Sequence, residues 1–249
     1  CLAFFIPALL IVGCGESAPN LGEDGTPAET VDTSAGEPDA SGFVWQTEQF
    51  AYLKLIRYQV GGWNKLSDDQ QKLAYCLTQA GLSGRDIMYD QNNRYNLRVR
   101  HMLDEAHRNF SGDRSTTGWQ RFHTFAKRVW FSNGIHHHYS NAKIVPECGR
   151  PYFEYVLENS GLGADEGHAE VLDMLYDPSR EAKKVELDAT KGLVESSAIN
   201  FYAPDVSTEE AQAFFANYAV DRNKPVEKGL NSRLVKDDEG NVIEEVYKV

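Results

Sequence analysis

The stretch TGWQRFHTFAKRVWFSNG, residues 117–134, decides the fold class. Its large apolar residues recur every three or four positions, which is the spacing of one buried face of a helix. Asn133 and Gly134 follow, and both residue types adopt positive φ at low cost. We therefore predict a helix that ends before Asn133. The apolar face comprises Trp119, Phe122, Phe125, Ala126, Val129 and Trp130.

Helical spacing recurs on both sides of this stretch. Two segments also begin with a capping box, Ser67 with Gln70 and Ser207 with Glu210, and we expect Gly81 to end the first of them. The polar stretch 83–100 either lines a groove or forms an exposed helix with paired charges. The predicted helices are 47–60 (with Phe50, Leu53, Ile56 and Val60 on one face), 67–81, 95–110, 117–132, 151–159, 164–176, 180–190 and 207–218.

The last residues change from helical spacing to alternation. The sequence RLVKDDEGNVIEEVYKV, residues 233–249, has two alternating segments around an Asp-Glu-Gly-Asn turn, which predicts a β-hairpin. Because a lone hairpin is marginal in water, we expect its sheet partners to come from sequence beyond Val249. The predicted fold is mainly α with a small β part (α+β), ending in an incomplete β-hairpin.

The amino-terminal region predicts export and lipidation. Residues 2–13 are apolar but too short to span a membrane, so they fit the h-region of a signal whose start is missing. The run ends at Ile11-Val12-Gly13-Cys14, which resembles a bacterial lipobox; the alternative is a chance cysteine. We expect a signal over 1–13, lipidation at Cys14, a flexible acidic linker over 14–42 and a folded part over 43–249. The expected location is the bacterial cell envelope, at its periplasmic or outer-membrane face.

Composition limits the partners of the chain. The net charge is −12 and the folded part has no Lys/Arg cluster, so nucleic acid is not expected as a partner. Two cysteines, Cys76 and Cys148, fall in the folded part. A disulfide between them is possible in an exported protein, but we favour two free thiols.

Three consecutive histidines, His136 to His138, raise the question of a metal site. No histidine is followed by the Glu-x-x-His of a zincin helix. From an extended strand only His136 and His138 share a side, so they supply two ligands at most. We predict that the triplet forms hydrogen bonds in a loop, and that His168 is solvated on a surface helix. Glycine loops for phosphate or dinucleotides and a Gly-x-Ser-x-Gly elbow are also absent from the sequence.

The chain resembles the amino-terminal part of the dipeptidyl peptidase III family, in its bacterial envelope branch. Three stretches carry the resemblance: FVWQTEQFAYLKLIRYQVGGWNKLSDDQQKLAYCLTQAGLSGRDIMYDQNNRYNLRVR, RVWFSNGIHHHYSNAKIVP and INFYAPDVSTEEAQAFFANY. The second is the most specific, because eukaryotic relatives have a comparable Tyr-Ser-Asn, glycine, aromatic, Lys-x-Val-Pro segment. The family consists of two-lobed zinc exopeptidases that remove dipeptides from the amino terminus of short peptides.

The resemblance implies that this chain is the helical beginning of the lower lobe. The family's His-Glu-x-x-Gly-His zinc motif and later glutamate ligand are absent from these residues, so we expect zinc only in the full-length parent and none on this fragment. The resemblance also places a substrate-binding segment on the lower wall of the cleft. That segment comprises Asn133, Gly134, His136, His137, His138 and Tyr139.

Two alternative functions are therefore considered for this chain. In the first, the chain is an amino-terminal fragment of a zinc-dependent dipeptidyl peptidase that binds short peptides, is inactive alone and requires the missing carboxy-terminal remainder of the polypeptide. In the second, it is a non-catalytic envelope lipoprotein that binds peptides or a partner protein. Both include a membrane anchor at Cys14.

Overall fold

The computed structural model describes residues 35–163, 165–217 and 232–246. Its fold is mainly α with a small β part, as the sequence predicts. Contacts within the chain divide it into two compact units, Cys1–Leu82 and Ser83–Val249. Among the described residues, no helix combines the length and the apolar content needed to cross a membrane. The signal, Cys14 and most of the predicted linker lie outside the described residues.

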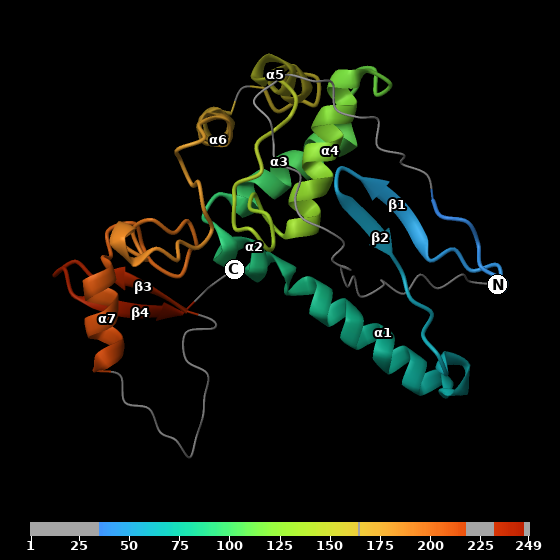
Figure 1. Ribbon diagram of the computed structural model, residues 1–249, viewed down its shortest axis with the longest axis horizontal. Coiled ribbons are helices and arrows are strands. Elements are labelled where there is room, and N and C mark those ends of the chain that lie inside the picture. The colour runs from blue at the N-terminus through green and yellow to red at the C-terminus, as the bar shows by residue number, and fades with distance from the viewer. Residues whose placement is uncertain (1–34, 164, 218–231, 247–249) are drawn as a thin grey trace. The chain divides into compact units, whose positions relative to one another are not determined.

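The first unit contains a β-hairpin where we predicted a helix over 47–60. Strands β1 (Gln46–Phe50) and β2 (Leu53–Ile56) pair antiparallel, and Phe50 lies opposite Leu53 (Figure 1). A two-residue turn joins them, with Ala51 at φ 47°. The prediction was wrong because residues three apart also meet across such a turn, so the Phe50–Leu53 spacing fits either structure.

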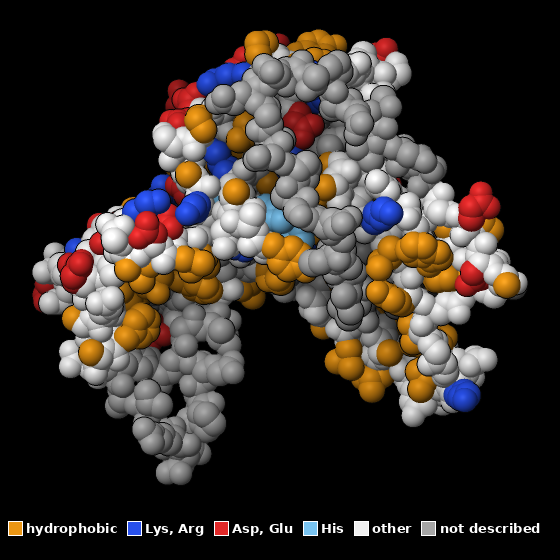
Figure 2. Space-filling view, in the orientation of Figure 1, with side chains coloured by type: hydrophobic (Ala, Val, Ile, Leu, Met, Phe, Trp, Pro, Cys, Tyr) orange, Lys and Arg blue, Asp and Glu red, His pale blue; other side chains and the backbone are white. Residues whose placement is uncertain are grey.

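Helix α1 (Asp68–Ser83) follows the short 3₁₀ helix η1 (Trp63–Lys65). The predicted capping box is confirmed: Gln70 N donates to Ser67 Oγ at 3.3 Å, and Ser67 N donates to Gln70 Oε1 at 2.9 Å. The predicted stop at Gly81 was wrong, because the helix continues to Ser83. Hydrophobic side chains of α1 are exposed, including Leu73 at 59% and Leu77 at 64%. Orange hydrophobic surface is visible in the region of α1 at the lower right of Figure 2.

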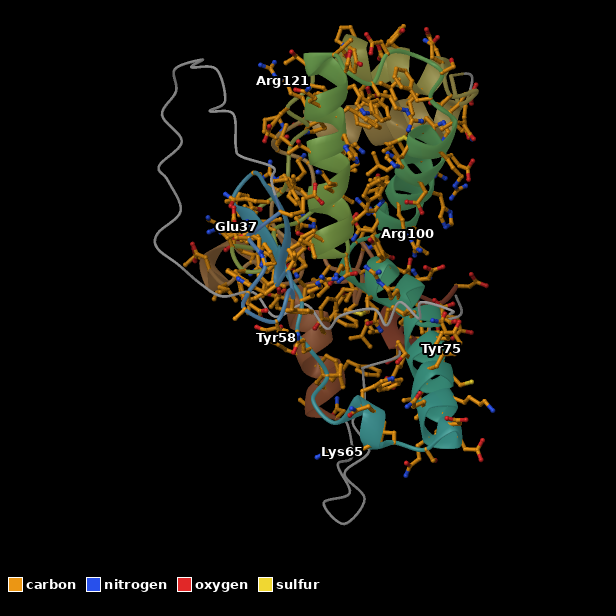
Figure 3. All side chains as sticks on the ribbon, turned by 90° about the vertical axis from the view of Figure 1, so that its right-hand side faces the viewer. Glu37, Tyr58, Lys65, Tyr75, Arg100 and Arg121 are labelled. Atoms are coloured by element: carbon orange, nitrogen blue, oxygen red, sulfur yellow. The ribbon has the colours of Figure 1, made fainter. Side chains whose placement is uncertain are left out.

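Helices α3 to α6 of the second unit supply the helical side chains of its main core. The stretch 83–100 forms α2 and the start of α3, with Arg100 paired to Asp86 across them. Figure 3 shows side chains filling the space between these helices, with Arg100 labelled on α3. The core includes the face predicted for 117–132 and side chains from α3, α5 and α6. The helices are α2 (Arg85–Asn92), α3 (Asn96–Asn109), α4 (Thr117–Ser132), α5 (Arg150–Glu158) and α6 (Glu166–Tyr176).

The predicted helix over 180–190 was also wrong. The segment after α6 is irregular, and only η2 (Ala189–Lys191) is helical in it. Its backbone is held by tertiary hydrogen bonds instead: Lys143 N donates to Ala182 O at 3.0 Å and Lys184 N to Asn141 O at 2.8 Å. Helical propensity was overridden because these partners come from distant parts of the chain.

A second, smaller core joins α7 (Thr208–Ala216) to the hairpin of β3 (Ser232–Lys236) and β4 (Val242–Val246). The capping box of Ser207 with Glu210 and the hairpin are both confirmed. However, β3 pairs within this chain: Ala203 N donates to Leu234 O at 2.8 Å and Leu234 N to Phe201 O at 2.9 Å. Among the described residues, the sheet of β3 and β4 has two strands and β3 is joined to residues 201–203 by an isolated bridge, so the expectation of further partners beyond Val249 stays a prediction. Tyr218 and residues 247–249 lie outside the described residues.

Candidate functional site

The candidate site begins where α4 ends. Asn133 adopts the left-handed conformation, with φ 52° and ψ 44°, so the predicted helix stop is confirmed. Its side-chain oxygen accepts a hydrogen bond from Arg85 at 3.0 Å, and its carbonyl accepts one from Asn92 at 3.1 Å. Gly134 follows with φ 143°. Both residues therefore reverse the chain direction, and Asn133 is held on two sides.

Asn96 holds the backbone in place directly after the turn, at Ile135. Its Oδ1 atom accepts a hydrogen bond from Ile135 N at 3.0 Å, and its Nδ2 atom donates to Tyr89 O at 3.0 Å. The Asn96 side chain is fully buried. A Cβ atom on Gly134 would lie 2.2 Å from Asn96 Nδ2, so the close approach requires glycine.

Four extended segments, 135–137, 142–144, 182–184 and 198–199, then lie side by side; we call them the site ladder. Ile144 N donates to Ile135 O at 2.7 Å, and His137 N to Ala142 O at 2.8 Å. Ala198 N and Ile199 N donate to Lys183 O and Lys184 O at 2.9 and 3.0 Å. The ladder therefore connects the histidine triplet to the irregular segment after α6.

His136 is buried inside this ladder, with 2% of its surface exposed. Its Nε2 atom lies 2.7 Å from the carbonyl oxygen of Glu181. Because a carbonyl only accepts, Nε2 carries the proton. Burial lowers the pKa of the His136 imidazole to about 4, so the ring is neutral near pH 7. The predicted hydrogen-bonding role is confirmed for this histidine.

His137 stabilises the turn that leads out of the ladder. Its Nδ1 atom accepts hydrogen bonds from Tyr139 N at 3.2 Å and Ser140 N at 3.0 Å. Asn141, with φ 61°, closes the turn by donating from its N–H to His137 O at 3.1 Å. His137 therefore also has the hydrogen-bonding role that the sequence predicts.

His138 and Tyr139 form the accessible part of the site. The His138 ring lies between neighbouring rings, with centroids 4.6 Å from His137, 4.4 Å from Tyr139 and 5.3 Å from Phe131. Both ring nitrogens of His138 are shielded from solvent and lack a hydrogen-bond partner among the described residues. Burial lowers the pKa of this imidazole. Tyr139 covers it and is 61% exposed.

Lys143 connects the segment 142–144 to the end of α6 and to the segment that follows it. Its ammonium donates to the carbonyl oxygens of Met174 and Arg180, each at 2.8 Å, and to that of Asp177. It therefore satisfies carbonyl groups at and beyond the end of α6. Burial lowers the pKa of Lys143, while Asp177 and Glu181 oppose the shift.

The three histidines of the triplet are not arranged as a three-ligand metal site. The backbone engages His136 Nε2 and His137 Nδ1, whereas His136 Nδ1 and both ring nitrogens of His138 have no hydrogen-bond partner among the described residues. Across the described ranges 35–163, 165–217 and 232–246, no group of three or more His, Cys, Asp or Glu side chains is arranged to hold a metal ion. His168 is not solvated as predicted: its side chain is 14% exposed, and its Nδ1 atom lies 3.0 Å from Leu162 O.

The sequence analysis predicted that the segment 133–139 binds substrate, but it did not predict the residues that hold this segment in place. Of the six predicted substrate-binding residues, Gly134 and His136 are buried, Asn133, His137 and His138 are half-buried, and Tyr139 is exposed. The missed anchors are Asn96, Glu181 and Lys143. A signal for Lys143 existed, because it belongs to the Lys-x-Val-Pro segment that carries the resemblance. Asn96 and Glu181 have no comparable motif.

Two comparisons with known proteins find no match: no protein-family model matches the chain, and no curated protein matches it.

Proposed function

We propose that this chain is the substrate-side part of a zinc-dependent dipeptidyl peptidase that resembles the dipeptidyl peptidase III family. The observation that best supports the proposal is the anchored segment 133–139, which ends in an exposed aromatic surface. Its backbone is held by Asn96, and its first histidine by the Glu181 carbonyl. The segment therefore offers a preorganised surface to a short peptide.

Tyr139 provides the first contact in this proposal. Its exposed ring offers apolar area and its hydroxyl a hydrogen bond, and tyrosine supplies such contact at low entropic cost. Displacement of the Tyr139 ring would uncover His138, whose ring nitrogens have no partner among the described residues. A buried polar group without a partner costs about 1–3 kcal/mol. A peptide N–H or carbonyl that bonds to His138 would recover that energy.

His136 and Asn133 position the surface rather than contact the peptide. His136 is buried, and Asn133 is held by Arg85 and Asn92. Neither side chain therefore offers a peptide as much exposed surface as Tyr139 does. In this proposal the zinc and its ligands belong to the parent enzyme outside these residues, where the metal would polarise the scissile carbonyl. We also propose the bacterial envelope as the location and a lipid at Cys14 as the anchor.

Two measurements test the proposal. The reading frame that follows Val249 is expected to continue into a His-Glu-x-x-Gly-His segment, and the encoded polypeptide is expected to release dipeptides in a chelator-sensitive reaction. The 249-residue chain alone is expected to be inactive with zinc. Zinc-dependent dipeptide release by the 249-residue chain would contradict the proposal. A stop codon directly after Val249 would also contradict it and favour the non-catalytic peptide-binding lipoprotein.

A further inference from the structure

A lysine of the site ladder has a half-buried side chain without a counter-ion. The backbone N–H of Lys184 donates to Asn141 O at 2.8 Å, and Asn141 N in turn donates to His137 O at 3.1 Å. Lys184 is half-buried, and its ammonium has no hydrogen-bond or ion-pair partner among the described residues. Removing a charge from water costs free energy unless the charge is paired. Lys184 therefore keeps three N–H donors for an anionic partner.

The charge of Lys184 acts on all three histidines of the triplet. Burial lowers the pKa of the imidazoles of His136 to His138, and the nearby Lys184 ammonium lowers each of them further. Burial also lowers the pKa of Lys184 itself, and no acid among the described residues opposes that shift. Lys143 differs, because Asp177 and Glu181 oppose the effect of burial on its pKa. Lys184 thus lies near the triplet and is not compensated by an acid.

The charges that act on the accessible end of the triplet are cationic. After burial, Arg128 and Lys184 lower the pKa of His137, and Lys184 also lowers that of His138. Among the described residues, no carboxylate raises the pKa of either imidazole. The surface around His138 and Tyr139 therefore has a positive potential, although the chain as a whole has a net charge of −12.

The carboxylates around the site are engaged by other groups. Each one accepts from a neighbouring side chain: Glu181 from Arg94, Glu147 from Arg128 at 2.8 Å, and Asp177 from Ser179 Oγ at 2.6 Å. The pairing of Arg128 with Glu147 also compensates the second cation that acts on His137. Lys184 is therefore left with a positive charge that no acid among the described residues neutralises.

The neighbours of this charge are suited to a carboxylate. A neutral imidazole has one N–H donor, and both ring nitrogens of His138 lack a partner among the described residues. The side chain of Tyr139, which is 61% exposed, carries a hydroxyl. An ionised carboxylate accepts several hydrogen bonds at once, and those from an ammonium are the strongest. A cationic group would be repelled by Lys184, and a neutral group would gain no charge–charge attraction.

We propose that the segment 133–139 binds peptides that carry a carboxylate in preference to neutral peptides, and that the Lys184 ammonium binds this carboxylate beside His138. An acidic side chain and the carboxy terminus of a short peptide share this chemistry. The inference rests on the proposed function, because it assigns a preference to the same peptide-binding surface. Lys184 is a specificity-determining residue in this account.

The test is an amide NMR titration of the 249-residue chain with four tetrapeptides, at fixed ionic strength and in the presence of a metal chelator. The probes are Ala-Ala-Asp-Ala amide, its neutral isostere Ala-Ala-Asn-Ala amide, and Ala-Ala-Ala-Ala as the free acid and as the amide. We expect a carboxylate peptide to bind at least fivefold more tightly than its neutral counterpart, with shifts at 133–139 and at Lys184. A gain for the Asp peptide assigns an acidic side chain, and a gain for the free acid assigns the carboxy terminus.

The outcomes separate this inference from the proposed function. If all four peptides shift the amides of 133–139 with equal affinity, the carboxylate preference is wrong and the proposed peptide binding stands. If no peptide shifts these amides, the proposed function fails and the inference fails with it.

Variants assign the preference to Lys184. Lys184→Met removes an ammonium without a partner, so the variant is expected to fold, to lose the preference and to bind the neutral peptide as before. Lys184→Arg should keep the preference. Lys72→Met, on α1, is the matched control, because Lys72 is 77% exposed and lies 3.8 Å from Asp69. It should also keep the preference.

A thermal unfolding curve shows that each variant is folded. A full carboxylate preference in folded Lys184→Met would contradict the assignment to Lys184. In the unsubstituted chain, added salt should reduce the preference, because screening weakens an ion pair at the surface. A preference that does not change with salt would also contradict an ion pair with Lys184.

Discussion

The side chain of Asn96 occupies the space that a side chain on Gly134 would need. A Cβ atom added to Gly134 would lie 2.2 Å from Asn96 Nδ2 and 2.6 Å from Asn96 Cγ. At the same time, Asn96 bonds to Ile135 N and Tyr89 O. One contact thus links the end of α2, the start of α3 and the turn after α4.

Gly134→Ala should therefore destabilise the second unit. The new methyl group displaces Asn96, and alanine is strained at φ 143°. We expect a loss of at least about 2 kcal/mol in the free energy of unfolding, measured in urea. Gly149→Ala is the control, since its Cβ would meet only Pro151 at 3.8 Å and its φ is −60°. Similar losses for the two variants would refute the role of the Asn96 contact.

The helices of the main core could be predicted because their apolar faces are long and regular. The face of α4 is buried almost as expected, and Pro151 correctly placed the start of α5. The segments 47–60 and 180–190 could not be predicted from spacing. The first has a two-residue turn at Ala51 that no glycine or asparagine marks, and the second is held by Lys143.

The turn at the start of the candidate site was predictable from the sequence, but the hydrogen bonds inside the candidate site were not. The Asn-Gly pair and the triplet located the turn, because these residue types are found beyond helix ends. Whether each histidine is buried depends on partners far away in sequence, such as Glu181 for His136. Such pairings leave no periodic signal in the chain.

His136 should make the stability of the second unit depend on pH. Its pKa is about 4 when folded and 6.5 when unfolded, so the unfolded state binds the proton more readily. The contribution of His136 to the free energy of unfolding is fully present above pH 6.5. It decreases as the pH falls towards 4, by on the order of 3 kcal/mol in total. His136→Gln should lose this dependence, as measured by urea unfolding between pH 4 and 7. An identical pH profile in the variant would refute the assignment to His136.

Lys143→Met should destabilise the segment after α6. It leaves the carbonyl groups of Met174, Asp177 and Arg180 without their donor, which we expect to cost about 2 kcal/mol or more. Hydrogen exchange should accelerate at the amides of 182–184 in the site ladder, where Lys184 N donates to Asn141 O. Lys191→Met, which removes an exposed lysine, should change stability by less than about 0.5 kcal/mol. Unchanged exchange in Lys143→Met would contradict the role given to Lys143.

Cys76 and Cys148, the free cysteines among the described residues, should differ in reactivity towards a thiol reagent. Cys76 is exposed on α1, whereas Cys148 is buried, with its Sγ atom 3.8 Å from the Tyr176 hydroxyl. Burial raises the pKa of the Cys148 thiol, which lowers its thiolate fraction. We expect Cys76 to react at least tenfold faster in the native protein and the two rates to converge in urea. Equal native rates, measured by mass spectrometry of labelled peptides, would contradict the buried position of Cys148.

Tyr139→Ala should weaken peptide binding without loss of stability, because the side chain is 61% exposed. We expect a decrease in affinity of about fivefold or more, consistent with the loss of an aromatic contact of about 1 kcal/mol. Tyr75→Ala is the control, since Tyr75 is 45% exposed on α1, where Figure 3 labels it. If Tyr139→Ala, Tyr75→Ala and the unsubstituted chain bind the peptide with equal affinity, Tyr139 does not belong to the proposed binding surface.

The most direct test of the proposed function is an amide NMR titration of the 249-residue chain with a tetrapeptide, in the presence of a metal chelator. We predict saturable shifts at the amides of 133–139 and at those of their ladder partners 142–144, with no requirement for zinc. Shifts confined to other parts of the chain, or shifts at the histidine triplet only after zinc is added, would contradict the assignment of this segment to substrate binding.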